Sequence, residues 1–128
     1  MGAAAIAARL ADARKFLDAA DLYIGEEDVA SWKVAGSNAV NAGIAASDVI
    51  CGVVLGECPR SGNHEDALIV LWEATQPDPA PRKHLRALLS DKSDYQYGTS
   101  GVRQQAAAAL VEHARNLAAE SSRRSEER

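Results

Sequence analysis

The chain has 128 residues and a mass of 13.5 kDa, which is the size of a single domain. With 47% hydrophobic and 25% charged residues it has the composition of a folded, soluble protein rather than a disordered one. About a fifth of the chain is alanine and only six residues are aromatic, which argues against strand-rich folds. The net charge of −4 excludes a protein that attracts nucleic acid over its whole surface.

The first half of the sequence predicts two helices. Between residues 3 and 24 the apolar residues recur in steps of three and four, which is typical of an amphipathic helix, and Gly25 ends it. The acidic residues 26–28 suit the positive N-terminal end of a second helix. From Val29 to Leu55 only Lys33 and Asp48 are charged. A helix that is apolar all round has to be enclosed, so we expect it at the centre of a bundle.

Three further helices are predicted in the second half. Ser61 or Asn63 is placed to cap a third helix that runs to about Thr75. The prolines between residues 77 and 81 separate it from a fourth helix, which extends to about Lys92 and has Leu85, Leu88 and Leu89 on its core edge. A last helix runs from Gly101 to about Glu120, with one face formed by Val102, Ala106, Leu110, His113 and Leu117.

These elements predict an all-α fold, a five-helix bundle in which the long second helix is central. Residues 1–120 form the single domain. Residues 121–128 have no apolar side chain, so we expect them to be a disordered polar tail.

Several classes of protein and site are not indicated by the sequence. The first residues lack the basic leader of a secretion signal, and we find no apolar run of membrane-span length, so we predict a cytoplasmic protein with no membrane partner. Cys51 and Cys58 lack metal-ligand spacing and companions, which predicts reduced thiols and no metal. Neither GxGxxG nor GxxxxGK occurs, and no cofactor is predicted.

Asp48 is the most informative polar residue, because it lies within the apolar second helix on the same line as Asn41 and Cys51. An unpaired buried carboxylate is costly, so three interpretations stay open. Asp48 joins two helices as a polar latch, lines a ligand-binding pocket, or lies at the surface. The partners that we consider for its carboxylate are Arg60, His64, Lys92, Tyr95 and Arg103.

Arg60 and His64 form a candidate catalytic pair, since an arginine and a histidine are the minimum set for cleaving RNA through its own 2′-hydroxyl. The simpler interpretation is an exposed histidine in the first turn of a helix. Residues 79–103 hold five Lys/Arg against two Asp/Glu, which indicates either a local nucleic-acid patch or the ordinary solvated faces of amphipathic helices. Tyr95 lies near Lys92, where its ring could stack on a base or anchor the loop on the bundle. We expect His84 in a solvated basic face, and His113 as a hydrogen-bonded core residue.

The order of these elements resembles that of small HEPN-domain proteins of actinobacteria. The resemblance covers residues 8–119 and rests on the segments 13–20, 38–51, 62–67, 85–95 and 106–119. It implies a helical bundle that forms homodimers and works in toxin–antitoxin or other defence systems, often beside a nucleotidyltransferase. Many members are metal-independent ribonucleases with four to six residues between Arg and His. Arg60 and His64 have three residues between them and do not match that motif.

Two functional hypotheses follow. In the first, the chain is a dimeric, non-catalytic or cryptic HEPN-like component that binds a partner protein, such as an antitoxin or nucleotidyltransferase, or a nucleotide or RNA ligand. Its ligand-binding residues would be Asn41, Asp48, Lys92 and Tyr95. In the second, it is a metal-independent ribonuclease toxin in which Arg60 and His64 are catalytic.

Overall fold

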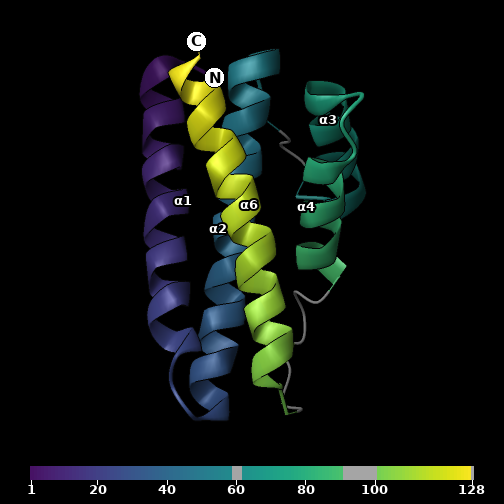
Figure 1. Ribbon diagram of the computed structural model, residues 1–128. Coiled ribbons are helices and arrows are strands. Elements are labelled where there is room, and N and C mark those ends of the chain that lie inside the picture. The colour runs from purple at the N-terminus through teal and green to yellow at the C-terminus, as the bar shows by residue number, and fades with distance from the viewer. Residues whose placement is uncertain (59–61, 91–100, 128) are drawn as a thin grey trace.

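The computed structural model describes residues 1–58, 62–90 and 101–127, and every regular element in them is a helix. The prediction of an all-α bundle is confirmed, and five helices are present in the described residues (Figure 1). They are α1 (Ala3–Ile24), α2 (Val29–Leu55), α3 (His64–Thr75), α4 (Ala80–Ser90) and α6 (Gln104–Glu126).

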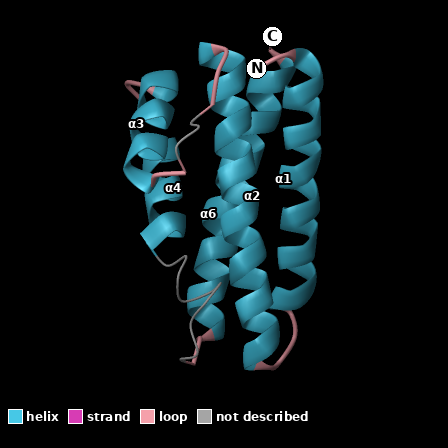
Figure 2. Cartoon of the chain, turned by 180° about the vertical axis from the view of Figure 1, so that it is seen from behind, coloured by secondary structure: helices cyan, strands magenta, loops and turns pink. Residues whose placement is uncertain are grey.

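The bundle has two parts. The long helices α1, α2 and α6 lie side by side, and α3 and α4 form a shorter hairpin beside them, as both views show (Figures 1 and 2). The hairpin contacts α2 and α6, whereas α2 contacts all four other helices. Val40, Val49 and Ile50 of α2 are fully buried. The central position predicted for the second helix is therefore confirmed.

The two ends of α2 are set by local sequence. Asp28 is its N-cap, and the Asp28 side chain accepts a hydrogen bond from the backbone N–H of Ser31 at 2.8 Å. At the other end Gly56 has a φ of +81°, a left-handed conformation that favours glycine, and its N–H donates to the carbonyl of Gly52. These caps fix the length of the central helix.

Small residues let the long helices pack closely. The surfaces of α1, α2 and α6 that face one another are rich in fully buried alanines, which permits a short spacing between helix axes. They include Ala13, Ala20, Ala35, Ala39, Ala42, Ala45, Ala46, Ala107 and Ala114. Gly43 goes further, because a Cβ atom there would collide with Cδ1 of Leu88 on α4. The hairpin thus inserts a leucine where α2 has no side chain.

The C-terminal helix differs from its prediction. It begins at Gln104 and continues to Glu126, so residues 121–126, which we expected to be disordered, are helical. Ser121 is fully buried, and the carboxylate of Glu120 pairs with Arg123 and Arg124 one turn on. A sequence without apolar residues therefore extends the helix through ion pairs and one buried small side chain.

The buried face of α6 is also shifted from the predicted one. Leu110 and Leu117 are buried as expected, but Ala106 is exposed and Ala107 is buried instead. The prediction followed a single line of steps of three and four, whereas a helix packed against three others, here α1, α2 and α4, buries a broader stripe.

By length and hydropathy α2 could cross a membrane. An 18-residue window in it has a mean hydropathy of 1.5, and 61% of that window is buried inside the structure. The expectation that no apolar run reaches the length of a membrane span is therefore wrong for this segment. The enclosed core helix of a soluble bundle has the same composition.

Candidate functional site

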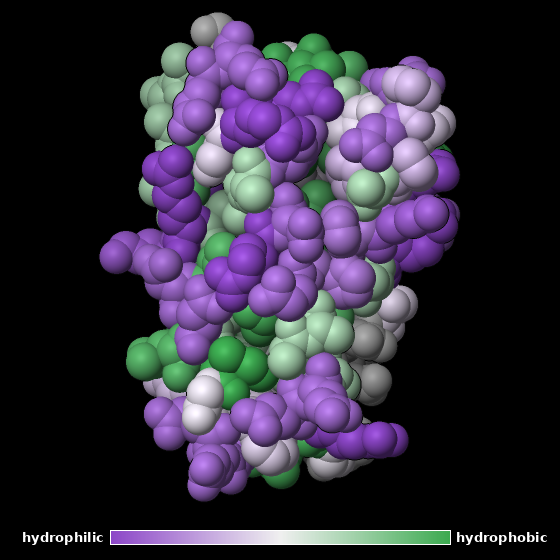
Figure 3. All heavy atoms as spheres, viewed as in Figure 1, coloured by the Kyte–Doolittle hydropathy of each residue, from purple (hydrophilic) through white to green (hydrophobic). Residues whose placement is uncertain are grey.

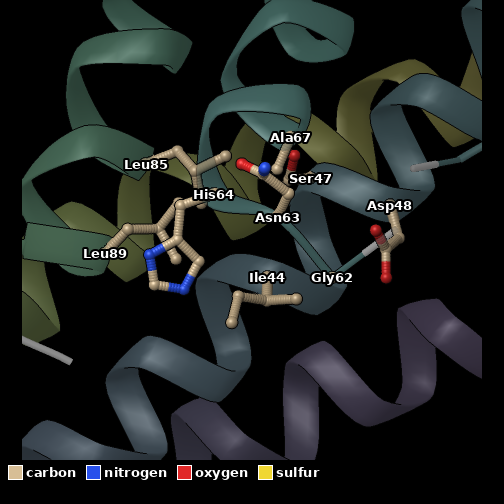
Figure 4. A pocket seen from close by; sticks show the side chains of 9 residues that line it. All are labelled: Ile44, Ser47, Asp48, Gly62, Asn63, His64, Ala67, Leu85 and Leu89. Atoms are coloured by element: carbon tan, nitrogen blue, oxygen red, sulfur yellow. The ribbon is translucent and has the colours of Figure 1, made fainter. Parts of the chain in front are cut away.

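A pocket of about 180 Å³ lies where the α3–α4 hairpin meets α2 (Figure 4). Helix α2 supplies a polar edge, α3 and the residues before it supply the rim, and α4 supplies an apolar wall. The lining residues are Ile44, Ser47, Asp48, Gly62, Asn63, His64, Ala67, Leu85 and Leu89. Asp48 and His64, both singled out from the sequence, thus line the same pocket.

Asp48 is held by a residue that we did not predict. Its Oδ2 accepts a hydrogen bond from Nε of Arg9 on α1 at 3.0 Å, and the two side chains are 18% and 31% exposed. Of the predicted partners, His64 and Arg103 lie in the described residues, and neither bonds to Asp48 there. Asp48 therefore latches α1 to α2 and lines a pocket at once, which combines two interpretations that we had kept apart.

The sequence held a signal for this pair. Helices joined by a short turn run antiparallel, so their residues pair around the turn. The amino group of Met1 bonds to the carbonyl of Gly56, and Arg9 bonds to Asp48. In both pairs the two residue numbers add up to the same total, so both follow one antiparallel register. Counting outward from the acidic residues 26–28 places Arg9 opposite residue 45, within one turn of Asp48, so it narrows the partner of Asp48 to one stretch of the first helix.

Burial sets the electrostatics of this pair. It raises the pKa of Asp48, and the hydrogen bond and charge of Arg9 offset only part of that effect. For Arg9 burial lowers the pKa, but the bonds to Asp48 and Asp12 outweigh it, so the net shift is upward. Among the described residues, Oδ1 of Asp48 has no hydrogen-bond partner. A desolvated carboxylate with one free oxygen favours a ligand that donates a hydrogen bond.

His64 is the first residue of α3 and is exposed. The predicted cap is confirmed at Asn63, whose side chain accepts from the N–H of Glu65 at 2.8 Å. Figure 4 shows His64 and Asp48 on opposite sides of Ile44, with the imidazole beside Leu89. The ring therefore stands at the rim and does not touch the carboxylate.

The other predicted site residues are not gathered in this pocket by the described structure. Arg60, Lys92 and Tyr95 lie outside the described residues. Asn41 is half-buried on α2, two turns before Asp48, and is not one of the residues lining the pocket. Sequence reasoning missed Ser47 and the apolar residues Ile44, Leu85 and Leu89, because nothing in a helix pattern separates a pocket wall from ordinary core.

The thiol of Cys51, one turn after Asp48, is a poor nucleophile because it stays protonated. Burial, and next the charge of Asp48, raise the pKa of Cys51 to about 12. Cys51 and Cys58 are both free thiols, as predicted. In the described part of the chain, no three His, Cys, Asp or Glu residues are grouped so that they could hold a metal ion.

A second polar cluster lies where α4 meets α6. Nδ1 of His84 and Nδ1 of His113 are 2.9 Å apart, and both side chains are half-buried. His113 is hydrogen-bonded as predicted, whereas the expectation that His84 belongs to a solvated basic face is wrong. The neighbouring Arg82 also turns inward, with its guanidinium 4.5 Å from the ring centre of Trp72.

Comparison of the sequence with models of protein families gives no match, and comparison with curated proteins gives no significant match.

Proposed function

We propose that this chain is a HEPN-like, dimeric and non-catalytic component of a toxin–antitoxin or defence-type system in the cytoplasm. We further propose that the pocket lined by Asp48 and His64, the Asp48–His64 pocket, binds an unpaired base of a nucleotide or RNA. The observation that carries the proposal is the pocket itself, which is lined both by apolar side chains and by a desolvated carboxylate whose Oδ1 has no hydrogen-bond partner among the described residues.

The size and chemistry of the pocket favour a single planar group. Sites for drug-sized ligands measure roughly 300–1,000 Å³, so a pocket of about 180 Å³ accepts one ring or one side chain of a larger partner. Oδ1 of Asp48 would accept from a ring N–H or amino group, and Ile44, Leu85 and Leu89 would contact the ring faces. Among the described lining residues there is no Lys or Arg, so a phosphate would stay outside.

The test is a titration of the ¹⁵N-labelled protein with each of the four nucleoside monophosphates and with short single-stranded RNAs. The amide signals of residues 44–48 and 62–67 should shift. Asp48→Asn should weaken binding by about tenfold or more, because a hydrogen bond to a charged group is worth about 1.5–3 kcal/mol. Asp12→Asn is the matched control, since Asp12 also pairs with Arg9 but lies outside the pocket.

Two results would oppose this function. The pocket amides would stay unshifted with every nucleotide and RNA, or a partner protein such as an antitoxin or nucleotidyltransferase would shift them while no nucleotide does. In the second case the pocket takes a side chain of that partner.

The dimer is proposed from the outer surface of the long helices. Ala4, Ala8 and Ala11 of α1 are exposed small residues, and Leu22 near its end is 66% exposed. Figure 3 shows a mostly polar face with apolar side chains gathered low over α1 and α6. Light scattering should give twice the chain mass at micromolar concentration, and Leu22→Lys should reduce it. A single-chain mass for the unmodified protein would remove the dimer.

One observation favours the ribonuclease as a second candidate. The imidazole of His64 is exposed at the pocket rim beside the N-terminus of α3, where a phosphate would be favoured. An RNA-cleavage assay without metal, with His64→Ala and Arg60→Ala as controls, tests it. Cleavage that both variants abolish supports the enzyme, and intact RNA excludes it.

A further inference from the structure

The contact between His84 and His113 has the geometry of a head-on hydrogen bond. Their Nδ1 atoms are 2.9 Å apart and their ring centres 5.2 Å apart. Ring bonds of about 1.33 Å place each atom about 1.1 Å from its ring centre, so two Nδ1 atoms pointing straight at each other would give centres about 5.2 Å apart. The observed value matches, so each nitrogen points at the other.

The distance between the two Nδ1 atoms fits a shared proton better than a shared metal ion. Two imidazole nitrogens on one tetrahedral zinc, each about 2.0–2.1 Å from the metal, would be about 3.3 Å apart and would converge at an angle. The observed 2.9 Å is a hydrogen-bond distance. One histidine therefore carries a proton on Nδ1 and donates it to the bare Nδ1 of the other.

We propose that His84 and His113 form a proton-sensitive clasp that fastens α4 to α6 and thereby controls how firmly the α3–α4 hairpin closes the Asp48–His64 pocket. With one proton between the two facing nitrogens the bond is intact. When both nitrogens are protonated, two N–H groups and two positive charges face each other, and no hydrogen bond can form.

The surroundings of His84 favour its neutral form. Burial and then the charge of His113 lower the pKa of His84, and Asp78, which precedes α4, opposes them. Beside His84 lies a small polar pocket to which α6 contributes Glu120 and Arg123, already paired with each other. Helices α2 and α3, which also pack on α4, place no charged side chain among the described residues of that pocket.

The direction of the pH effect follows from the lowered pKa. A released His84 has the ordinary value of 6.5, and the clasped residue has a lower one. The clasped state therefore keeps its full stability above pH 6.5 and loses it as pH falls from 6.5 toward the lowered pKa.

The clasp is coupled to the pocket through α4. Leu85 and Leu89, which form the apolar wall of the pocket, lie one and five residues after His84 on this short helix. Loosening of α4 from α6 would therefore move that wall. This last step rests on the proposed function, but the clasp itself does not, and the experiment below reads it without any ligand.

The first measurement is the protonation of the ring nitrogens by ¹⁵N NMR on the unmodified protein. At pH 7.5 one of His84 and His113 should be the Nδ1–H tautomer and the other the Nε2–H tautomer. Two Nε2–H tautomers would overturn the clasp.

The second measurement is hydrogen exchange, corrected for the intrinsic effect of pH. Protection of the α4 amides should fall by up to about tenfold per pH unit below 6.5, while the α1 amides keep theirs. His84→Asn should remove this pH dependence, because an amide can donate to neutral His113 or accept from its protonated form. His64→Asn, which changes the other histidine near the hairpin, should leave the dependence in place. The proposal fails if His84→Asn keeps the wild-type pH dependence or if His64→Asn abolishes it, and His113→Asn repeats the test if His84→Asn does not fold.

Discussion

The three long helices and the α3–α4 hairpin are held by different kinds of contact. The long helices interlock through many buried alanines, so their backbones approach closely and their interface is continuous. The hairpin attaches through a few larger groups, namely the leucines of α4 and the histidine pair, whereas Arg82 stacked on Trp72 joins its own two helices. The first region, the body of the bundle, is held by many small contacts, whereas the second is held by a few, so single residues can loosen it.

The pocket and the clasp both lie at the boundary between these regions. We expect no cavity between the alanine faces, because such small side chains leave no irregular edges to be filled. It arises where Leu85 and Leu89 reach across to Ile44 and leave space around Asp48. At this boundary a ligand could shift the α3–α4 hairpin at a small cost in free energy, because only a few residues hold the hairpin in place.

The largest expected effect comes from removing the main anchor of the hairpin. Leu88 is fully buried and reaches Gly43 of the central helix. Leu88→Ala should lower the free energy of unfolding by about 2–5 kcal/mol, as large-to-small core changes do. Urea unfolding measures it, with Ile69→Ala on the exposed side of α3 as the control, which should cost less than about 0.5 kcal/mol. Equal losses in both variants would mean that the hairpin is not anchored at this leucine.

Two glycines of α2 compare the two regions, since Gly43 faces the hairpin and Gly52 faces Met1 and α1. Gly43→Val should cost about 1–3 kcal/mol, because the new side chain collides with buried Leu88. At Gly52 a Cβ meets the end of the flexible Met1 side chain and lies 3.3 Å from Cγ1 of buried Ile6, so Gly52→Ala needs only small shifts and should change the free energy of unfolding by less than about 1 kcal/mol. Thermal unfolding of both variants measures these changes in stability. If Gly52→Ala lost as much stability as Gly43→Val, the expected difference between the two positions would be wrong.

Most of the body could be predicted from the sequence, and the boundary could not. Helix periodicity and caps placed α1, α2 and α3 at the residues found, because those signals lie within a few residues of one another. The pairing of Arg9 with Asp48 and of His84 with His113 joins residues 39 and 29 positions apart, and depends on how the helices dock. The polar end of α6 was misjudged for the same reason, since the burial of Ser121 is a property of the assembled bundle.

The ion pair at the pocket should contribute more than a surface pair. Arg9→Met leaves the half-buried carboxylate of Asp48 without its partner, which should cost about 1–2 kcal/mol at pH 7. Because the pKa of Asp48 is already raised by burial and would rise further, the loss should shrink as pH falls through that pKa and the carboxyl becomes neutral. Urea unfolding at pH 7 and pH 4 tests this. Arg14→Met is the control, since Arg14 is exposed. If the loss of free energy of unfolding in Arg9→Met did not change with pH, Arg9 would not act through the charge of Asp48.

The smallest effect is expected at the second ion pair of α1, between Asp21 and Arg115 of α6. It is bidentate, but its side chains are 41% and 45% exposed, so water and salt screen the attraction. Asp21→Asn should change the free energy of unfolding by less than about 1 kcal/mol, and 1 M NaCl should abolish most of that difference. Urea unfolding in low and high salt measures it. A larger loss of free energy of unfolding that does not depend on salt would show that this pair, and not the alanine interface, holds α1 to α6. The three long helices would then depend on single contacts, as the hairpin does.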